Sequence, residues 1–271
     1  MFGAFNTFGK LGAIGKAIAA AWSPADLTDL AAWYDPSDLS TMFNDSAGTT
    51  PVATPGTVAD SANPVGLIQD KSGNGHHASQ STSTARPLLS AYDGQTLGPG
   101  DTYDATGYPV YLKFDGTDDG IATASFTAGT LTSSMDCLIA VRRDSAAATI
   151  VGLLSGPVND YFGHAESGLG IPCFIGVGTP TFWVDGVQLS GGTSVTANTL
   201  NTALTVGDWH IFEARGLDLS LWPVVIYGNR GGSYSVNGAN GGILLFESPA
   251  DPTERDNARA WLAAKVGVTL P

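Results

Sequence analysis

The chain has 271 residues, of which 43% are hydrophobic and only 14% are charged, and its net charge is −13. Negative charge repels phosphate groups, so the composition argues against nucleic acid and against anionic membrane surfaces as partners. Its 35 glycines and 15 prolines, with many serines and threonines, indicate short strands joined by many turns, as in an all-β protein.

Residues 1–22 form an apolar segment that we expect to be an arm outside the domain. Its hydrophobic side chains recur at helix-like spacing, but glycines weaken an isolated helix. A signal peptide needs a basic start, and Lys10 and Lys16 interrupt an apolar run that is also too broken to span a bilayer. The arm either packs on its own domain or, as we favour, docks on partners in an assembly. The expected contact residues are Phe2, Phe5, Phe8, Leu11, Ile14 and Ile18.

The segment DKSGNGHHASQ, residues 70–80, has the glycine spacing of a dinucleotide-binding loop. Such a loop needs a helix after its glycines, because the helix N-terminus faces the pyrophosphate. The residues that follow are rich in serine and threonine, lack an apolar helical period and end at Pro87. The sequence therefore does not support a nucleotide site.

Residues 23–271 have the pattern of one domain. Polar stretches at 44–64 and 90–107 indicate long surface loops. Between and after them, alternating apolar runs recur at roughly ten-residue spacing, which is typical of sandwiches and jelly rolls. Cys137 and Cys173 lie in such runs and are expected to be buried free thiols.

One helix is predicted with clear end signals, from Pro252 to Lys265. Asp251 is its expected N-cap, with Glu254 as partner in a capping box, and Gly267 follows its last turn.

Six stretches, taken in order, carry a family resemblance: LAAWYDPSDLST, DKSGNGHHASQSTSTARP, YLKFDGTDDGIAT, FWVDGVQ, GDWHIFEARGLDLSLW and ERDNARAWLAAKVGV. The chain resembles, over about residues 23–271, the concanavalin A-like, laminin G-like jelly-roll domains of virion proteins from tailed bacteriophages, prophages and gene transfer agents. This resemblance implies two antiparallel sheets packed face to face, with the closing helix laid against the sandwich.

The same resemblance gives the DKSGNG stretch another role, as a tight turn at a sheet edge. Gly73 and Gly75 are then expected at positive φ, and Asp70 or Ser72 is expected to bond backbone amides.

The sequence lacks the motifs of common hydrolases. Glycosidases on this fold carry an E-x-D-x-x-E triplet, which sets acid and nucleophile about 5 Å apart on one strand face. The sequence has no such triplet, no G-x-S-x-G and no H-E-x-x-H. Glu166, Glu213 and Glu247 have no other carboxylate at strand spacing, and Glu254 lies in the predicted helix. The histidines lack metal-ligand spacing: His76, His77, His164 and His210. We therefore expect a protein that is not an enzyme, in which His210 is a hydrogen-bonded strand residue.

Two features are candidates for binding. FDGTDDG places Asp115, Asp118 and Asp119 in one turn, where related lectin-like domains hold Ca²⁺ at the sandwich rim; an ordinary Asp-rich turn is the alternative. Exposed aromatic residues can stack on sugar rings, although tryptophans in jelly rolls more often lie in the core. The aromatic candidates are Trp183, Trp222, Tyr227 and Tyr234, and no glycan site is assigned among them.

The function expected from these observations is that of a structural and interaction component of a phage or phage-like particle. It would be assembled in the bacterial cytoplasm, would contact other virion proteins or its own copies through the arm, and would display a lectin-like domain toward host-surface glycans. Its place as head fibre, spike, capsid decoration, collar or tail fibre is open. The alternatives are a stand-alone carbohydrate-binding module and, less favoured, a polysaccharide depolymerase that uses dispersed carboxylates.

Overall fold

The structure is a computed structural model. It describes residues 22–52, 63–91, 110–123, 126, 131–145, 154–155, 161–163, 165, 173–175, 177–189, 195–220, 226–227, 229–230 and 234–271. The arm residues from Phe2 to Ile18 lie outside this part of the chain.

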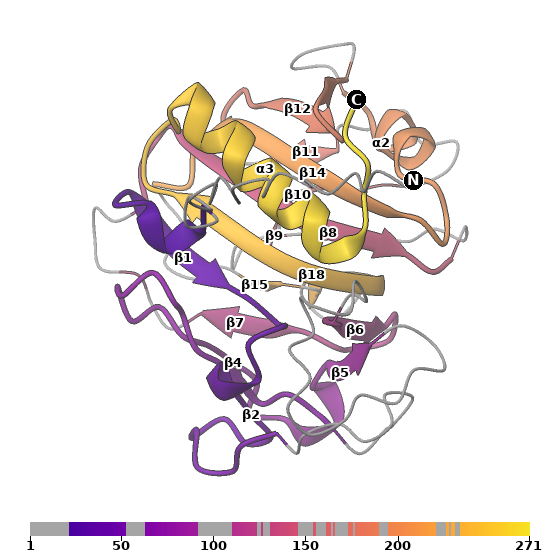
Figure 1. The fold of residues 1–271 in the computed structure, drawn as a ribbon. Helices are drawn as coiled ribbons and strands as arrows, with labels where there is room; N and C mark the ends of the chain where they lie inside the picture. Colours follow the sequence, from indigo (N-terminus) through magenta and orange to yellow (C-terminus); the bar gives the residue numbers. More distant parts are fainter. Residues whose placement is uncertain are drawn as a thin grey trace, which may run out of the picture.

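Two antiparallel sheets make up most of the described fold (Figure 1). Sheet A contains, in spatial order, β13 (Val187–Gln188), β12 (Thr181–Val184), β14 (Trp209–Leu217), β8 (Met135–Arg143), β18 (Asn237–Phe246), β6 (Val110–Asp115) and β5 (Leu88–Ala91), with β1 (Leu30–Tyr34) also paired to β18. Sheet B contains β11 (Phe174–Ile175), β10 (Tyr161–Phe162), β9 (Leu154–Ser155), β15 (Ile226–Tyr227), β7 (Ile121–Thr123), β4 (Ala78–Ser79), β3 (Leu67–Ile68) and β2 (Met42–Phe43). A separate hairpin pairs β16 (Asn229–Arg230) with β17 (Tyr234–Ser235). The expected all-β antiparallel sandwich is confirmed.

The central strands of sheet A, such as β8 and β18, are buried on both faces. Along β8, Cys137, Ile139 and Val141 belong to the core between the two sheets, whereas Leu138 and Ala140 belong to a second core under a helix. Successive side chains of a strand point to opposite faces, so a strand covered on both sides is apolar throughout. This explains why the run CLIAV lacks alternation of apolar and polar residues.

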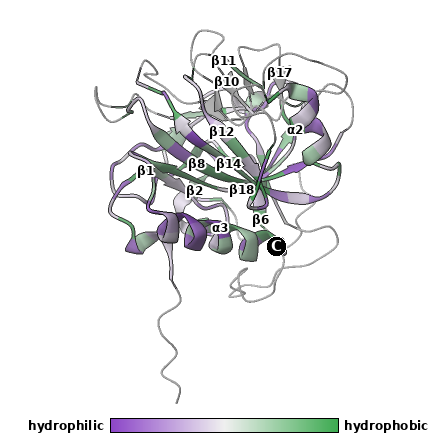
Figure 2. Cartoon of the chain, turned by 90° about the horizontal axis from the view of Figure 1, so that it is seen from above, coloured by the Kyte–Doolittle hydropathy of each residue, from purple (hydrophilic) through white to green (hydrophobic). Residues whose placement is uncertain are grey.

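The helix over the outer face of sheet A is α3 (Pro252–Val266). Figure 2 shows it on one side of the sheet, with β10 and β11 on the other. The Asp251 side chain accepts hydrogen bonds from the N–H groups of Thr253 (2.8 Å) and Glu254 (3.4 Å), and Gly267 ends the helix at φ 73°. The predicted helix and its cap are confirmed, although the described hydrogen bonds include none from the Glu254 side chain that would complete a capping box.

A close approach between α3 and β18 depends on glycine. A Cβ atom at Gly241 would lie 2.5 Å from Val266 Cγ1, and one at Gly242 would lie 3.0 Å from Leu262 Cδ2. The register of β18 shifts between Asn240 and Gly242, where Gly242 has φ 149°. Only residues without a side chain let the helix lie this near the strand.

A second helix, α2 (Ala197–Ala203), was not predicted. Its sequence, ANTLNTA, has low helix propensity, but the Thr196 side chain caps it by accepting from Thr199 N–H at 3.1 Å. Leu200 is fully buried in the core between the sheets. The buried Arg143 donates to the carbonyls of Asn201 and Leu204, each at 2.9 Å, at the end of this helix. Three short 3₁₀ turns, at Pro24–Asp26, Leu39–Thr41 and Ser83–Ala85, complete the helical residues in the described part of the chain.

No helix in the described part of the chain is long and apolar enough to cross a membrane.

Candidate functional site

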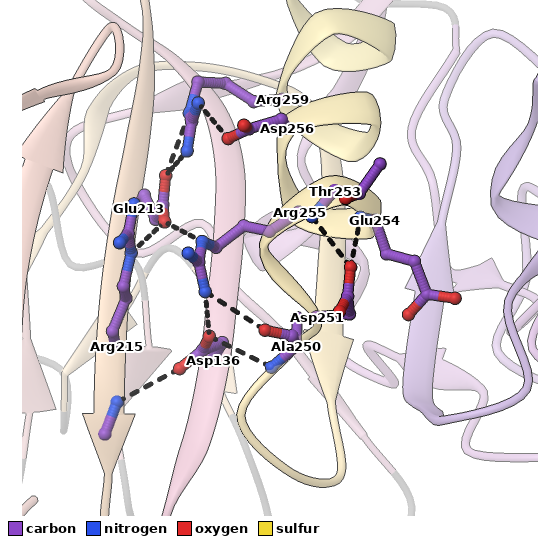
Figure 3. Close-up of polar contacts among 11 residues, drawn as sticks. Asp136, Glu213, Arg215, Ala250, Asp251, Thr253, Glu254, Arg255, Asp256 and Arg259 are labelled. Carbon is purple, nitrogen blue, oxygen red and sulfur yellow. Dashed lines mark hydrogen bonds and ion pairs between the residues drawn. The ribbon is translucent and has the colours of Figure 1, made fainter.

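An ionic cluster lies between sheet A and α3 (Figure 3). Its two carboxylates are Asp136 on β8 and Glu213 on β14, exposed by only 1% and 0%. Three guanidinium groups surround them, from Arg215 on β14 and from Arg255 and Arg259 on α3. The cluster therefore joins two neighbouring strands to the helix that covers them.

Glu213 is contacted by all three arginines. Arg259 Nη2 lies 2.8 Å from Glu213 Oε2, Arg255 Nε lies 3.2 Å from Oε1, and Arg215 Nε also donates to Oε1. Charged carboxylates enclosed in protein are stable only when such partners replace water. The position of Glu213 under the helix thus has a structural explanation.

Asp136 is held mainly by backbone groups. It accepts hydrogen bonds from the N–H groups of Gly216 (3.1 Å) and Ala250 (3.2 Å), and its Oδ2 lies 3.4 Å from Arg255 Nη1. Burial, with the nearby charge of Glu213, raises the pKa of Asp136. One guanidinium group therefore bridges the two carboxylates, and both are enclosed.

The three aspartates predicted as a metal site do come together. Oxygen atoms of Asp115, Asp118 and Asp119 lie within 4.8 Å of one another, a separation that one Ca²⁺ with bonds of about 2.4 Å can bridge. Gly116 has φ 81°, and Asp119 Oδ2 accepts from the Asp115 N–H at 2.9 Å. Asp119 is only 5% exposed, and burial together with the two neighbouring carboxylates raises its pKa to about 7.

The DKSGNG turn has the predicted local geometry. Gly73 and Gly75 have φ of 91° and 77°, and Asp70 accepts from the backbone N–H groups of Ser72 (2.9 Å) and His76 (3.0 Å). The turn joins β3 and β4 within sheet B and reaches across to β1, because Trp33 N–H also donates to Asp70 at 2.9 Å. The turn therefore covers the edge of β1, a strand of sheet A. The sequence predicted a position at a sheet edge but not which edge.

His210 is hydrogen-bonded on both ring nitrogens, as predicted. Its Nδ1 lies 2.7 Å from Asp185 Oδ2, and its Nε2 accepts from Thr205 N–H at 3.1 Å. The Thr205 hydroxyl, 2.9 Å from Nε2, also reaches Asp208 at 2.8 Å. These contacts fasten the β12–β13 turn to the residues preceding β14.

Of the aromatic candidates, the structure describes the side chain of Trp183. It is half-buried on the outer face of β12, with the Arg215 guanidinium 3.5 Å from its ring centroid. Trp222 and the side chains of Tyr227 and Tyr234 lie outside the described residues, as do Glu166 and His164. Cys137 and Cys173 are buried and unpaired, as expected, and burial raises the pKa of Cys173 to about 12.

No protein-family model and no curated protein matches the chain. Among solved structures, the chain is similar to Trypanosoma rangeli sialidase bound to the inhibitor DANA, with 12% identity, a TM-score of 0.37, and coverage of 85% of this chain and 36% of that one. A complex of the same sialidase with sialic acid gives 13% identity, a TM-score of 0.36 and coverage of 82% and 35%. The chain thus spans about a third of the sialidase, and a likeness this weak carries no argument about function.

Proposed function

We propose that the protein is a structural and interaction component of a bacteriophage or phage-like particle, and that its sandwich domain binds glycans of the host surface. The resemblance of residues 23–271 to virion jelly-roll domains supports this proposal. It implies localisation in the virion and assembly in the bacterial cytoplasm.

We propose that the protein is not an enzyme because of how the Asp136 and Glu213 carboxylates are enclosed. Both are fixed by arginines and backbone amides beneath α3. An acid and a nucleophile of a glycosidase need access to the glycosidic bond. The carboxylates that the fold brings together on these strands therefore hold the helix in place, which favours binding over hydrolysis.

The arm belongs to the same proposal. Trp22, the first described residue, packs against the core between sheet A and α3. We propose that the apolar side chains of the arm, residues 1–22, dock on other virion proteins or on copies of the same chain.

A calcium ion is the cofactor that the Asp115, Asp118 and Asp119 turn would hold. All three ligands are hard oxygen atoms at a suitable mutual distance. The ion would neutralise charge at the buried Asp119, so its role would be to stabilise the loop at the end of β6.

The deciding experiment is quantitative mass spectrometry of particles purified from the source strain. We expect the chain at a fixed copy number per particle. Its absence from particles, with the protein recovered from the medium or cell surface, would support a stand-alone carbohydrate-binding module instead.

A depolymerase is tested separately by incubating the protein with host polysaccharide. We expect no new reducing ends. Reducing ends that increase with protein and disappear in a Glu→Gln variant at one of the four glutamates would overturn the non-enzymatic assignment.

A further inference from the structure

Four side chains form a strip on the outer face of sheet A, beside α3. In the β12–β13 pair Trp183 lies opposite Gln188, and in the β12–β14 pair Thr181 lies opposite Arg215. Trp183 is also opposite Glu213, which faces α3, so the strip shares the face that the helix covers. Opposite residues of antiparallel strands have Cβ atoms about 5 Å apart and diagonal ones about 7–8 Å, so the strip spans the width of a sugar ring.

Arg215 is held in one position within the strip. Its Nε donates to Glu213, and its guanidinium group lies against the Trp183 ring, 3.5 Å from the centroid. Its side chain is 23% exposed, and its two Nη atoms have no hydrogen-bond partner in the described part of the chain. The entropy of ordering a long side chain is therefore already lost before a ligand binds.

The charge of Arg215 is incompletely compensated. Its only carboxylate partner among the described residues is Glu213, which Arg255 and Arg259 also contact. A guanidinium group whose two outer nitrogens have no partner among the described residues matches the two oxygens of a carboxylate. The protein as a whole carries a net charge of −13, which repels anions at long range, so recognition of one must depend on local contacts.

The neighbours of Arg215 supply the other contacts that a sugar needs. The half-buried Trp183 adds flat apolar surface, and the side chains of Thr181 and the exposed Gln188 have no hydrogen-bond partner among the described residues.

We propose that this strip binds a saccharide bearing a carboxylate, with Arg215 as the bidentate partner of that carboxylate. The inference rests on the proposed glycan binding and names its ligand class.

The test measures binding by isothermal titration calorimetry with the full-length protein. The probes are tetragalacturonate, a mannuronate tetrasaccharide and a hyaluronan hexasaccharide, each beside its neutral methyl ester. We expect at least one acid to bind, and its ester to bind about tenfold or more weakly. Arg215→Gln should weaken binding of the acid by a similar factor. Arg215→Lys should also weaken its binding, because lysine keeps the charge without the planar guanidinium group.

The matched control is Lys113→Gln, which removes the same charge from the exposed side chain of a distant strand, β6, and should leave binding within twofold. The Arg215 variants should fold, because Glu213 keeps Arg255 and Arg259, and a thermal melt checks this.

Equal binding of acid and ester, or an unchanged affinity in a folded Arg215→Gln variant, would overturn the carboxylate site while leaving a glycan-binding domain in place. Failure of all three acids to bind at millimolar concentration would also overturn it. The particle assignment is decided independently by mass spectrometry.

Discussion

At the scale of single residues, Glu213 has the largest expected effect on stability. Glu213→Gln removes the one carboxylate that Arg215, Arg255 and Arg259 share, and breaking a buried ion pair on one side costs about 3–5 kcal/mol. We expect a loss of this size in the free energy of unfolding, measured by urea denaturation.

The control is Glu254→Gln, because Figure 3 shows Glu254 on the same helix but pointing away from the cluster. It should change stability by less than about 0.5 kcal/mol. A Glu213→Gln variant as stable as this control would show that the cluster does not hold α3.

The raised pKa of Asp119 predicts that the stability of the protein depends on pH. Its pKa rises from the usual 3.8 to about 7 in the folded state, so the folded protein binds a proton there that the unfolded chain has already released. This contribution to stability is complete below about pH 4 and is lost as the pH rises through 7. Without calcium, Asp119→Asn should therefore gain stability relative to the wild type between pH 4 and pH 8, on the order of 2 kcal/mol.

Asp256→Asn, at a side chain 66% exposed, is the control for the loss of one carboxylate. Calcium provides a second test of Asp119, because the bound ion should stabilise the charged form of its carboxylate. Added CaCl₂ should raise the melting temperature of the wild type but not of Asp119→Asn. Equal responses of the two proteins to calcium would show that the ion does not bind at this turn.

At the scale of elements, the seat of α3 on β18 can be tested at Gly241. Gly241→Ala places a methyl group 2.5 Å from Val266 Cγ1 and 3.3 Å from Ala140 Cβ. Overpacking of this kind costs typically 1–3 kcal/mol, measured as the free energy of unfolding.

The double variant Gly241→Ala, Val266→Ala separates this close approach from other effects of the substitution. Removing the opposing methyl groups should recover part of the loss, so that the two changes are not additive. Additive losses would mean that the helix end does not rest on this glycine.

The elements that could be predicted from the sequence are those whose signals are local. Asp251 and Gly267 mark the ends of α3, and Asp70 organises its turn through N–H groups within six residues. The Asp115 turn is equally local. The Asp136 and Glu213 cluster was missed because its members meet only through strand register and the placement of a helix, which spacing along the chain does not encode.

At the scale of the whole molecule, the arm and the domain should be separable. Because Trp22 packs against the α3 side of sheet A, the informative truncation begins at Trp22. We expect residues 22–271 to melt at the temperature of the full chain but to lose self-association or incorporation into particles, measured by calorimetry, light scattering and particle mass spectrometry. A melting temperature lower by several degrees would place the arm in the domain's own core.

The central position of β18 also determines the order in which the molecule can form during synthesis. Without β18, β8 with β14, β12 and β13 is separated from β6 with β5, and β1 has no strand partner. A growing chain that has not passed Phe246 therefore carries most of sheet A as unjoined pieces with open edges. Such edges bind other chains, and long-range pairing is slow. The ribosome must thus deliver more than two hundred residues before the sheet can close, and we expect the unfinished chain to be prone to aggregation until then.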